Sequence, residues 1–167
     1  MNQKYRNFIM WALFSLLMLF VMLLQTTVFG RVRFHGVKLS LLPIAMVCIG
    51  MQVGHEAGGL FGMLTGFFWY AFGAEAGTLS IITFTLTGIF AGWLCDNLFA
   101  RRFLPALVLS LGALLLHEGL WFLLKYYLED APGELFRWVP ISAGLSLLTC
   151  PVIYLLAKLA RKAGGNG

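Results

Sequence analysis

The chain has little charge for its length. Only 11% of its 167 residues are charged, 60% are hydrophobic, and the mean hydropathy is +0.85. A soluble domain carries about 25% charged residues, which it needs to cover its surface. The shortage of charge excludes a soluble globular protein and predicts that most of the chain lies in a membrane.

The sequence also lacks the alternation of apolar and polar residues that a membrane β-barrel needs over segments of about 10 residues. Its apolar residues form continuous blocks instead, as a helix needs to cross an apolar layer about 30 Å thick. We therefore predict an all-α integral membrane protein with six transmembrane helices. They would form one polytopic membrane domain over residues 1–163, followed by a disordered tail at 164–167. The predicted spans are 8–29, 39–54, 58–73, 78–99, 103–124 and 139–160.

The boundary between the second and third spans is the least marked. Only His55-Glu56-Ala57 separates these two short blocks. Ionisable residues are costly in the middle of a bilayer, so we predict that these three residues form the turn of a tight helical hairpin. The alternative is one long broken helix, which would leave five spans and put the two termini on opposite sides of the membrane.

Cysteine is scarce, and its three positions lack the spacing of metal ligands. They fall in or at the ends of predicted spans, so we interpret them as small packing residues. These residues are Cys48, Cys95 and Cys150.

Catalytic motifs are absent. The pairs His55-Glu56 and His117-Glu118 would each need a second histidine four positions after the first to form a zinc protease site. Those positions hold Gly59 and Trp121. The sequence has no G-x-S-x-G nucleophile elbow and no glycine-rich phosphate loop. We therefore predict that the chain is not an enzyme and holds neither a metal nor a cofactor.

Basic residues near the ends of the spans predict the orientation, because cytoplasmic loops carry an excess of Lys and Arg. The first span lacks a signal-peptide cleavage site and is expected to remain. Six spans place more basic residues on the side of the termini, so we predict that both termini are cytoplasmic. The basic residues of the 31–38 loop oppose this orientation. The side of the termini holds Lys4, Arg6, Arg101, Arg102, Lys158, Arg161 and Lys162, and the other side holds Arg31, Arg33, Lys38, Lys125 and Arg137.

The net charge of +5 is accordingly a signal of membrane topology. No basic stripe with interleaved aromatic residues lies outside the spans, so a nucleic-acid partner is not expected. The partner of the three C-terminal basic residues is the lipid bilayer, whose anionic headgroups they are expected to meet. These residues are Lys158, Arg161 and Lys162.

Polar residues inside the predicted spans form a candidate intramembrane polar site, made of His117, Glu118 and Gln52. A carboxylate such as Glu118 costs several kcal/mol at this depth unless it is paired or neutralised. It could serve a polar cavity, a proton site or a partner contact. Alternatively, it fixes the packing through an interhelical hydrogen bond or reaches water near the outer face. For Gln52, as for Gln25, a packing hydrogen bond is the expected role.

The glycines follow a helical pattern. Gly58, Gly62 and Gly66 recur every four residues in the third span, and Gly88 and Gly92 do so in the fourth. Small residues let helix backbones approach closely in a membrane, where no hydrophobic drive brings helices together. Packing within the chain is one interpretation. A face that receives the helix of a partner protein is the other.

The chain resembles the rod shape-determining protein MreD family over most of its length. The matching segments are 23–29 (LLQTTVF), 41–45 (LLPIA), 58–67 (GGLFGMLTGF), 77–79 (GTL) and 88–94 (GIFAGWL). The family commonly has an aspartate after the Gly-Phe of its third helix. This chain has Phe72-Gly73-Ala74-Glu75 there, which leaves open whether Glu75 takes that role.

This resemblance implies a non-enzymatic subunit of the bacterial cell-elongation (rod) complex, located in the inner membrane. Such a subunit helps to maintain cell shape and to organise lateral peptidoglycan synthesis. Its implied partner is an MreC-type bitopic protein, with MreB, RodA and the RodA-associated transpeptidase as indirect partners. The family also implies the S-component fold of energy-coupling-factor transporters.

An alternative function follows from that same fold. The chain could be a substrate-binding S component of an energy-coupling-factor vitamin transporter. Such components usually carry small-residue faces on their first helix, whereas this first span has Ala12 and Ser15 among bulky residues. A small membrane enzyme or channel is a third possibility, but no span has the polar stripe that a water-filled path needs.

Overall fold

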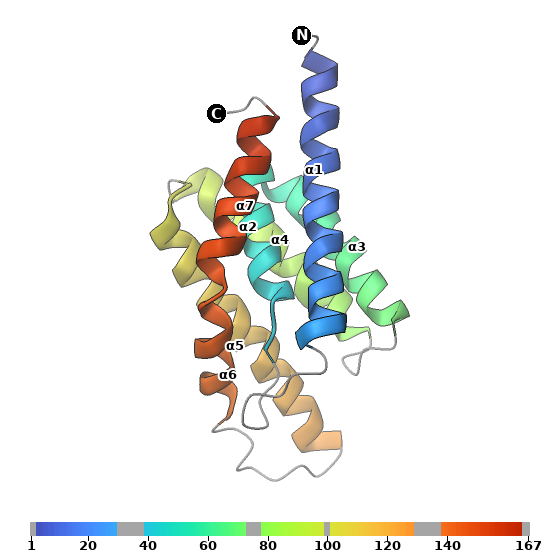
Figure 1. Ribbon diagram of the computed structural model, residues 1–167. Helices are drawn as coiled ribbons and strands as arrows, with labels where there is room; N and C mark the ends of the chain where they lie inside the picture. The colour runs from blue at the N-terminus through green and yellow to red at the C-terminus, as the bar shows by residue number, and fades with distance from the viewer. Residues whose placement is uncertain (1–2, 30–38, 73–77, 99–100, 129–137, 165–167) are drawn as a thin grey trace.

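The computed structural model describes residues 3–29, 39–72, 78–98, 101–128 and 138–164, and all regular structure within these ranges is helical (Figure 1). This confirms the prediction of an all-helical chain. The elements are α1 (Gln3–Leu24), the π-helix η1 (Gln25–Phe29), α2 (Leu42–Val53), α3 (His55–Ala71), α4 (Leu79–Asn97), α5 (Phe103–Leu128), α6 (Trp138–Leu147) and α7 (Cys150–Ala163).

Three segments of the described helices are long and apolar enough to cross a membrane: Asn7–Val28, Leu79–Asn97 and Phe103–Leu124. The pair Val139–Leu147 and Cys150–Ala163 makes a fourth if it is one span bent by 47°. Length and composition thus support a membrane protein with three or four candidate spans. The helices α2 and α3 are shorter, and the 12 residues of α2 rise only about 18 Å.

The chain runs back and forth along the bundle, so that its first and last described residues lie at the same end (Figure 1). Gly164, which follows α7, lies against Met10 of α1. Helices α2 and α3 run antiparallel, since Gly50 lies beside Gly58 and the Thr65 hydroxyl donates a hydrogen bond to the Met46 sulfur at 3.4 Å. We name the end with both termini the terminal end of the bundle.

The hairpin between α2 and α3 turns at a single residue, Gly54. Its φ of +91° lies in the region that favours glycine, which explains why the reversal occurs there. The prediction of a turn at His55-Glu56-Ala57 is therefore wrong by a few residues, because those three residues form the first turn of α3. The alternative of one long broken helix is also wrong, because α3 folds back along α2.

The predicted sixth span, 139–160, is not one straight helix. It breaks between α6 and α7, with Pro151 in the first turn of α7. A proline lacks an amide N–H and clashes with the preceding turn of a helix, so the straight path ends before it. Among the other predicted ends, α5 continues to Leu128, beyond the expected end at 124. The expected tail begins at Gly164, and 165–167 lie outside the described residues.

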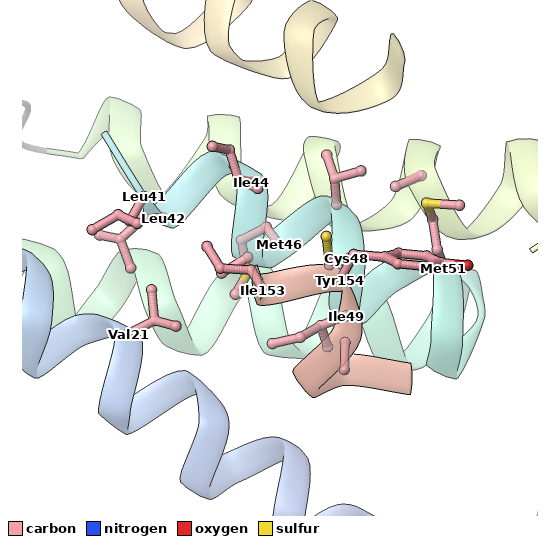
Figure 2. Packing of buried hydrophobic residues seen from close by; sticks show 14 of the residues in the cluster. Val21, Leu41, Leu42, Ile44, Met46, Cys48, Ile49, Met51, Ile153 and Tyr154 are labelled. Atoms are coloured by element: carbon pink, nitrogen blue, oxygen red, sulfur yellow. The ribbon is translucent and has the colours of Figure 1, made fainter. Parts of the chain in front are cut away.

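Helix α2 forms the centre of the bundle. It is buried from Leu42 to Gln52, on all sides, as expected for a helix that is apolar all round. Figure 2 shows its side chains packed against Val21 of α1 and against Ile153 and Tyr154 of α7. Because α2 is surrounded by protein and not by lipid, its shortness does not expose backbone to the bilayer.

The segment that leads into α2 is held by buried side chains. The Gln25 side chain donates to the Leu39 carbonyl at 2.8 Å and accepts from the Leu41 amide at 2.8 Å. The Ser40 amide donates to the hydroxyl of Ser146 in α6 at 3.0 Å. These bonds satisfy backbone groups that have no helical partner, which a buried segment at membrane depth requires. The structural role expected for Gln25 is confirmed.

Candidate functional site

The glycine faces of α3 and α4 meet each other. A Cβ atom added to Gly58 would lie 2.6 Å from the Gly88 carbonyl oxygen. Gly62 lies against the backbone of Phe84, and Gly92 lies against the backbone of His55. Gly66 lies similarly against Ile81 and Ser80. We name this contact the glycine seam.

The seam includes a glycine that the sequence analysis missed. A Cβ atom added to Gly50 of α2 would lie 2.6 Å from the Gly88 carbonyl oxygen, so Gly50, Gly58 and Gly88 meet at one point. The signal was present, because Gly50 and Gly54 extend the four-residue glycine repeat of α3 backwards across the turn.

The seam corrects the prediction of a partner-docking face at Gly58, Gly62, Gly66, Gly88 and Gly92. All five are buried, and each lies within contact distance of another backbone of the same chain. A partner helix would have to occupy space that α3 and α4 already fill. Packing within the chain is the interpretation that the structure supports.

Three other glycines have open space around them. A Cβ atom added to Gly112 or Gly119 of α5, or to Gly144 of α6, would meet no atom within 4 Å among the described residues. Gly112 lines a groove between α4 and α5, whereas Gly144 lines neither of the two grooves described below.

The α4–α5 groove is apolar along its length and has a volume of about 610 Å³. Val47 of α2 lies at its floor, together with the buried residues Ala91 and Ala113. Its rims carry exposed apolar side chains, namely Ile82, Leu86, Phe90, Val108 and Leu116. A second apolar groove, of about 660 Å³, lies between α1 and α7.

The histidine of the predicted polar site lies beside the end of the α4–α5 groove that is farther from the termini. His117 stacks on Phe84 with ring centroids 4.9 Å apart, and its Nδ1 atom is 3.4 Å from the Thr83 hydroxyl. Ser80 and Trp121 line the adjoining cavity, whose volume of about 10 Å³ barely admits one water. The neighbouring Glu118 is partly exposed and has an interaction of its own.

Gln52 does not join this site. Its Oε1 atom accepts a hydrogen bond at 3.3 Å from Arg161 of α7. Gln52 lies near Gly54, which faces Asp96 of α4, whereas His117 contacts Thr83 of the same helix. Residues 83 and 96 are about 20 Å apart along α4. The predicted set of His117, Glu118 and Gln52 therefore does not form one site. The hairpin carries Gln52 to the terminal end, away from His117.

The terminal end holds a charged cluster that the sequence analysis did not identify. Asp96 of α4 accepts from Arg101 at 2.8 Å and lies 3.4 Å from the Nδ1 atom of His55 in α3. The Tyr154 hydroxyl of α7 donates to the Arg101 carbonyl at 3.0 Å. Together with Gln52 and Arg161, these residues tie four helices and one loop together. We name this set the charged junction.

Within the described residues, no group of three His, Cys, Asp or Glu side chains is arranged to hold a metal ion. His55 and His117, which begin the two His-Glu pairs, lie at different ends of the bundle and contact Asp96 and Thr83 respectively.

Comparisons with known proteins found no relative. No protein-family model, no curated protein and no solved structure matches this chain.

Proposed function

We propose that this chain is a non-enzymatic subunit of the bacterial cell-elongation (rod) complex in the inner membrane, as its resemblance to the MreD family suggests. It would bind an MreC-type bitopic protein and, through it, MreB, RodA and its transpeptidase. The observation that carries the proposal is the α4–α5 groove, a lateral apolar surface that no part of the described chain covers.

The groove has the features that a transmembrane helix of a partner requires. Lipid provides no hydrophobic drive between helices, so association depends on close packing against small residues. Gly112 offers such a position, since a Cβ atom added there would meet no described atom within 4 Å. The floor residues Ala91 and Ala113 are small as well, and let an incoming helix approach α2.

We further propose that all six passes of the chain cross the membrane with both termini in the cytoplasm, in the S-component arrangement. The passes are α1 with η1, α2, α3, α4, α5, and α6 with α7. The common position of the two ends supports an even number of crossings (Figure 1). A periplasmic reporter fused after Gly167 should be inactive, and an active one would contradict this topology.

The partner-binding proposal is tested by closing the groove. Gly112→Leu should abolish co-purification of the MreC-type protein and make rod-shaped cells round, because the new side chain occupies the space of the partner helix. Gly144→Leu is the matched control: it replaces an equally open glycine outside both grooves. Both changes raise helix propensity to the same extent, so neither should unfold the chain.

Equal co-purification by the two variants would contradict the groove as the partner site. Depletion of the whole protein tests the function itself, and cells should then round up. Unchanged shape with lost vitamin uptake would instead favour the S-component alternative.

A further inference from the structure

The charged junction extends over the surface of α7. Tyr154, Lys158 and Arg161 follow each other at positions i, i+4 and i+7, so they share one face of that helix. Tyr154 binds the Arg101 carbonyl, and Arg161 interacts electrostatically with both Arg101 and Asp96. This face thus gathers Arg101, Lys158 and Arg161 at the terminal end of the bundle.

Positive charge exceeds negative charge at this place. Asp96 already pairs with Arg101 and contacts His55. Arg161 donates to the neutral amide of Gln52 and has no carboxylate within ion-pair distance among the residues that the structure describes. The Arg161 guanidinium is held by the buried side chain of Gln52, whereas the Arg101 guanidinium is held by Asp96. The buried Tyr154 fixes the backbone of Arg101 through its carbonyl.

Apolar side chains adjoin the cations where the candidate span Phe103–Leu124 begins. Phe103 packs edge-on against Tyr154 with ring centroids 5.6 Å apart, and Leu104 is 73% exposed. Both lie at the start of α5, two and three residues after Arg101 in the chain. Cations beside an exposed apolar surface fit a molecule that is anionic at its head and apolar in its chains.

We propose that Arg101, Lys158 and Arg161 bind the phosphate headgroup of an anionic phospholipid, whose acyl chains lie against Phe103 and Leu104. A planar guanidinium matches the oxygens of a phosphate in a bidentate geometry, and Lys158 adds a point charge. The site concerns lipid and requires only a membrane location, so it is independent of the partner proposed above.

The test is native mass spectrometry of the full chain in detergent, titrated with phosphatidylglycerol and with phosphatidylethanolamine of the same acyl chains. Phosphatidylglycerol should bind at least about fivefold more tightly. Arg161→Gln and Lys158→Gln should each weaken its binding by about fivefold, since each removes one cation near the headgroup. Arg102→Gln is the control, because Arg102 is exposed and, among the described residues, it is Arg101 and not Arg102 that contacts Asp96 and Tyr154; this variant should change binding less than twofold.

Lys158→Gln keeps the test valid if Arg161→Gln unfolds the chain, because Lys158 is exposed. Equal weakening by Lys158→Gln and Arg102→Gln would overturn the site in favour of diffuse surface charge. Equal binding of the two lipids would overturn the preference for an anionic headgroup. Full displacement of phosphatidylglycerol by millimolar inorganic phosphate would overturn the lipid as ligand and indicate a site for soluble anions.

Discussion

Helix α4 has two faces that pack in opposite ways. Towards α3 it brings Gly88 and Gly92 so close to the facing backbone that a single added carbon would collide. Towards α5 it presents Leu86 and Phe90, which stand apart from that helix and leave the α4–α5 groove. In a bilayer, close approach depends on the absence of side chains. The comparison teaches that glycine placement decides which helix pairs close and which surfaces stay available to other molecules.

The largest effect is expected in the glycine seam. Gly88→Val should lower the free energy of unfolding by about 3 kcal/mol, because its side chain would collide with the backbone of Gly58. Unfolding in mixed detergent micelles, followed by circular dichroism, measures this loss. Gly112→Val is the control on the open side and should not destabilise the chain. Similar losses in both variants would remove the distinction between the two faces.

A smaller loss of stability is expected at the entry to α2, the central helix of the bundle. Gln25→Leu removes two hydrogen bonds to the backbone of Leu39 and Leu41 and leaves those buried groups unsatisfied. The cost should be about 2 kcal/mol by the same measurement. Thr27→Ala is the control, since Thr27 is exposed and bonds only within its own helix among described residues. No difference between the two variants would show that the hydrogen bonds of Gln25 are dispensable for stability.

The turn that aligns the seam should be less sensitive. Gly54→Ala keeps ordinary contact distances, as its Cβ atom would lie 3.4 Å from the Asp96 carboxylate. The cost comes from the backbone of Gly54, whose φ of +91° and ψ of +175° lie in a region that is essentially restricted to glycine, and it should be about 1.5 kcal/mol. A loss as large as that of Gly88→Val would mean that the turn, and not the seam, holds α3 against α4.

The smallest change in the free energy of unfolding is expected on the face of α4 that is directed towards α5. Thr83→Val removes the contact with His117 and should lower the free energy of unfolding by about 0.5 kcal/mol. Thr87→Val serves as control, because the Thr87 hydroxyl bonds to the Thr83 carbonyl within α4. A loss of several kcal/mol specific to Thr83→Val would show that the His117 contact, and not the packing on α2, joins α4 to α5.

The lengths of the apolar blocks predict much of the fold. The predicted spans 78–99 and 103–124 agree well with α4 and with the start of α5. The ionisable residues at 55–57 predict the turn there, but the reversal occurs at Gly54, because the backbone requires a positive φ. The spacing of the glycines predicts helix packing, but it does not specify whether they meet the same chain or another.

The charged junction could not be predicted beyond the local pair of Asp96 and Arg101, since His55 and Arg161 reach that pair only after α3 and α7 have packed beside α2. The sequence by itself determined the helical class, the membrane environment and the small faces of α3 and α4, because hydropathy and residue size are properties of each position. Only the tertiary structure decided which faces are filled, which groove stays open and which charges gather. Those outcomes depend on which helices become neighbours, and that follows from the packing of the whole bundle.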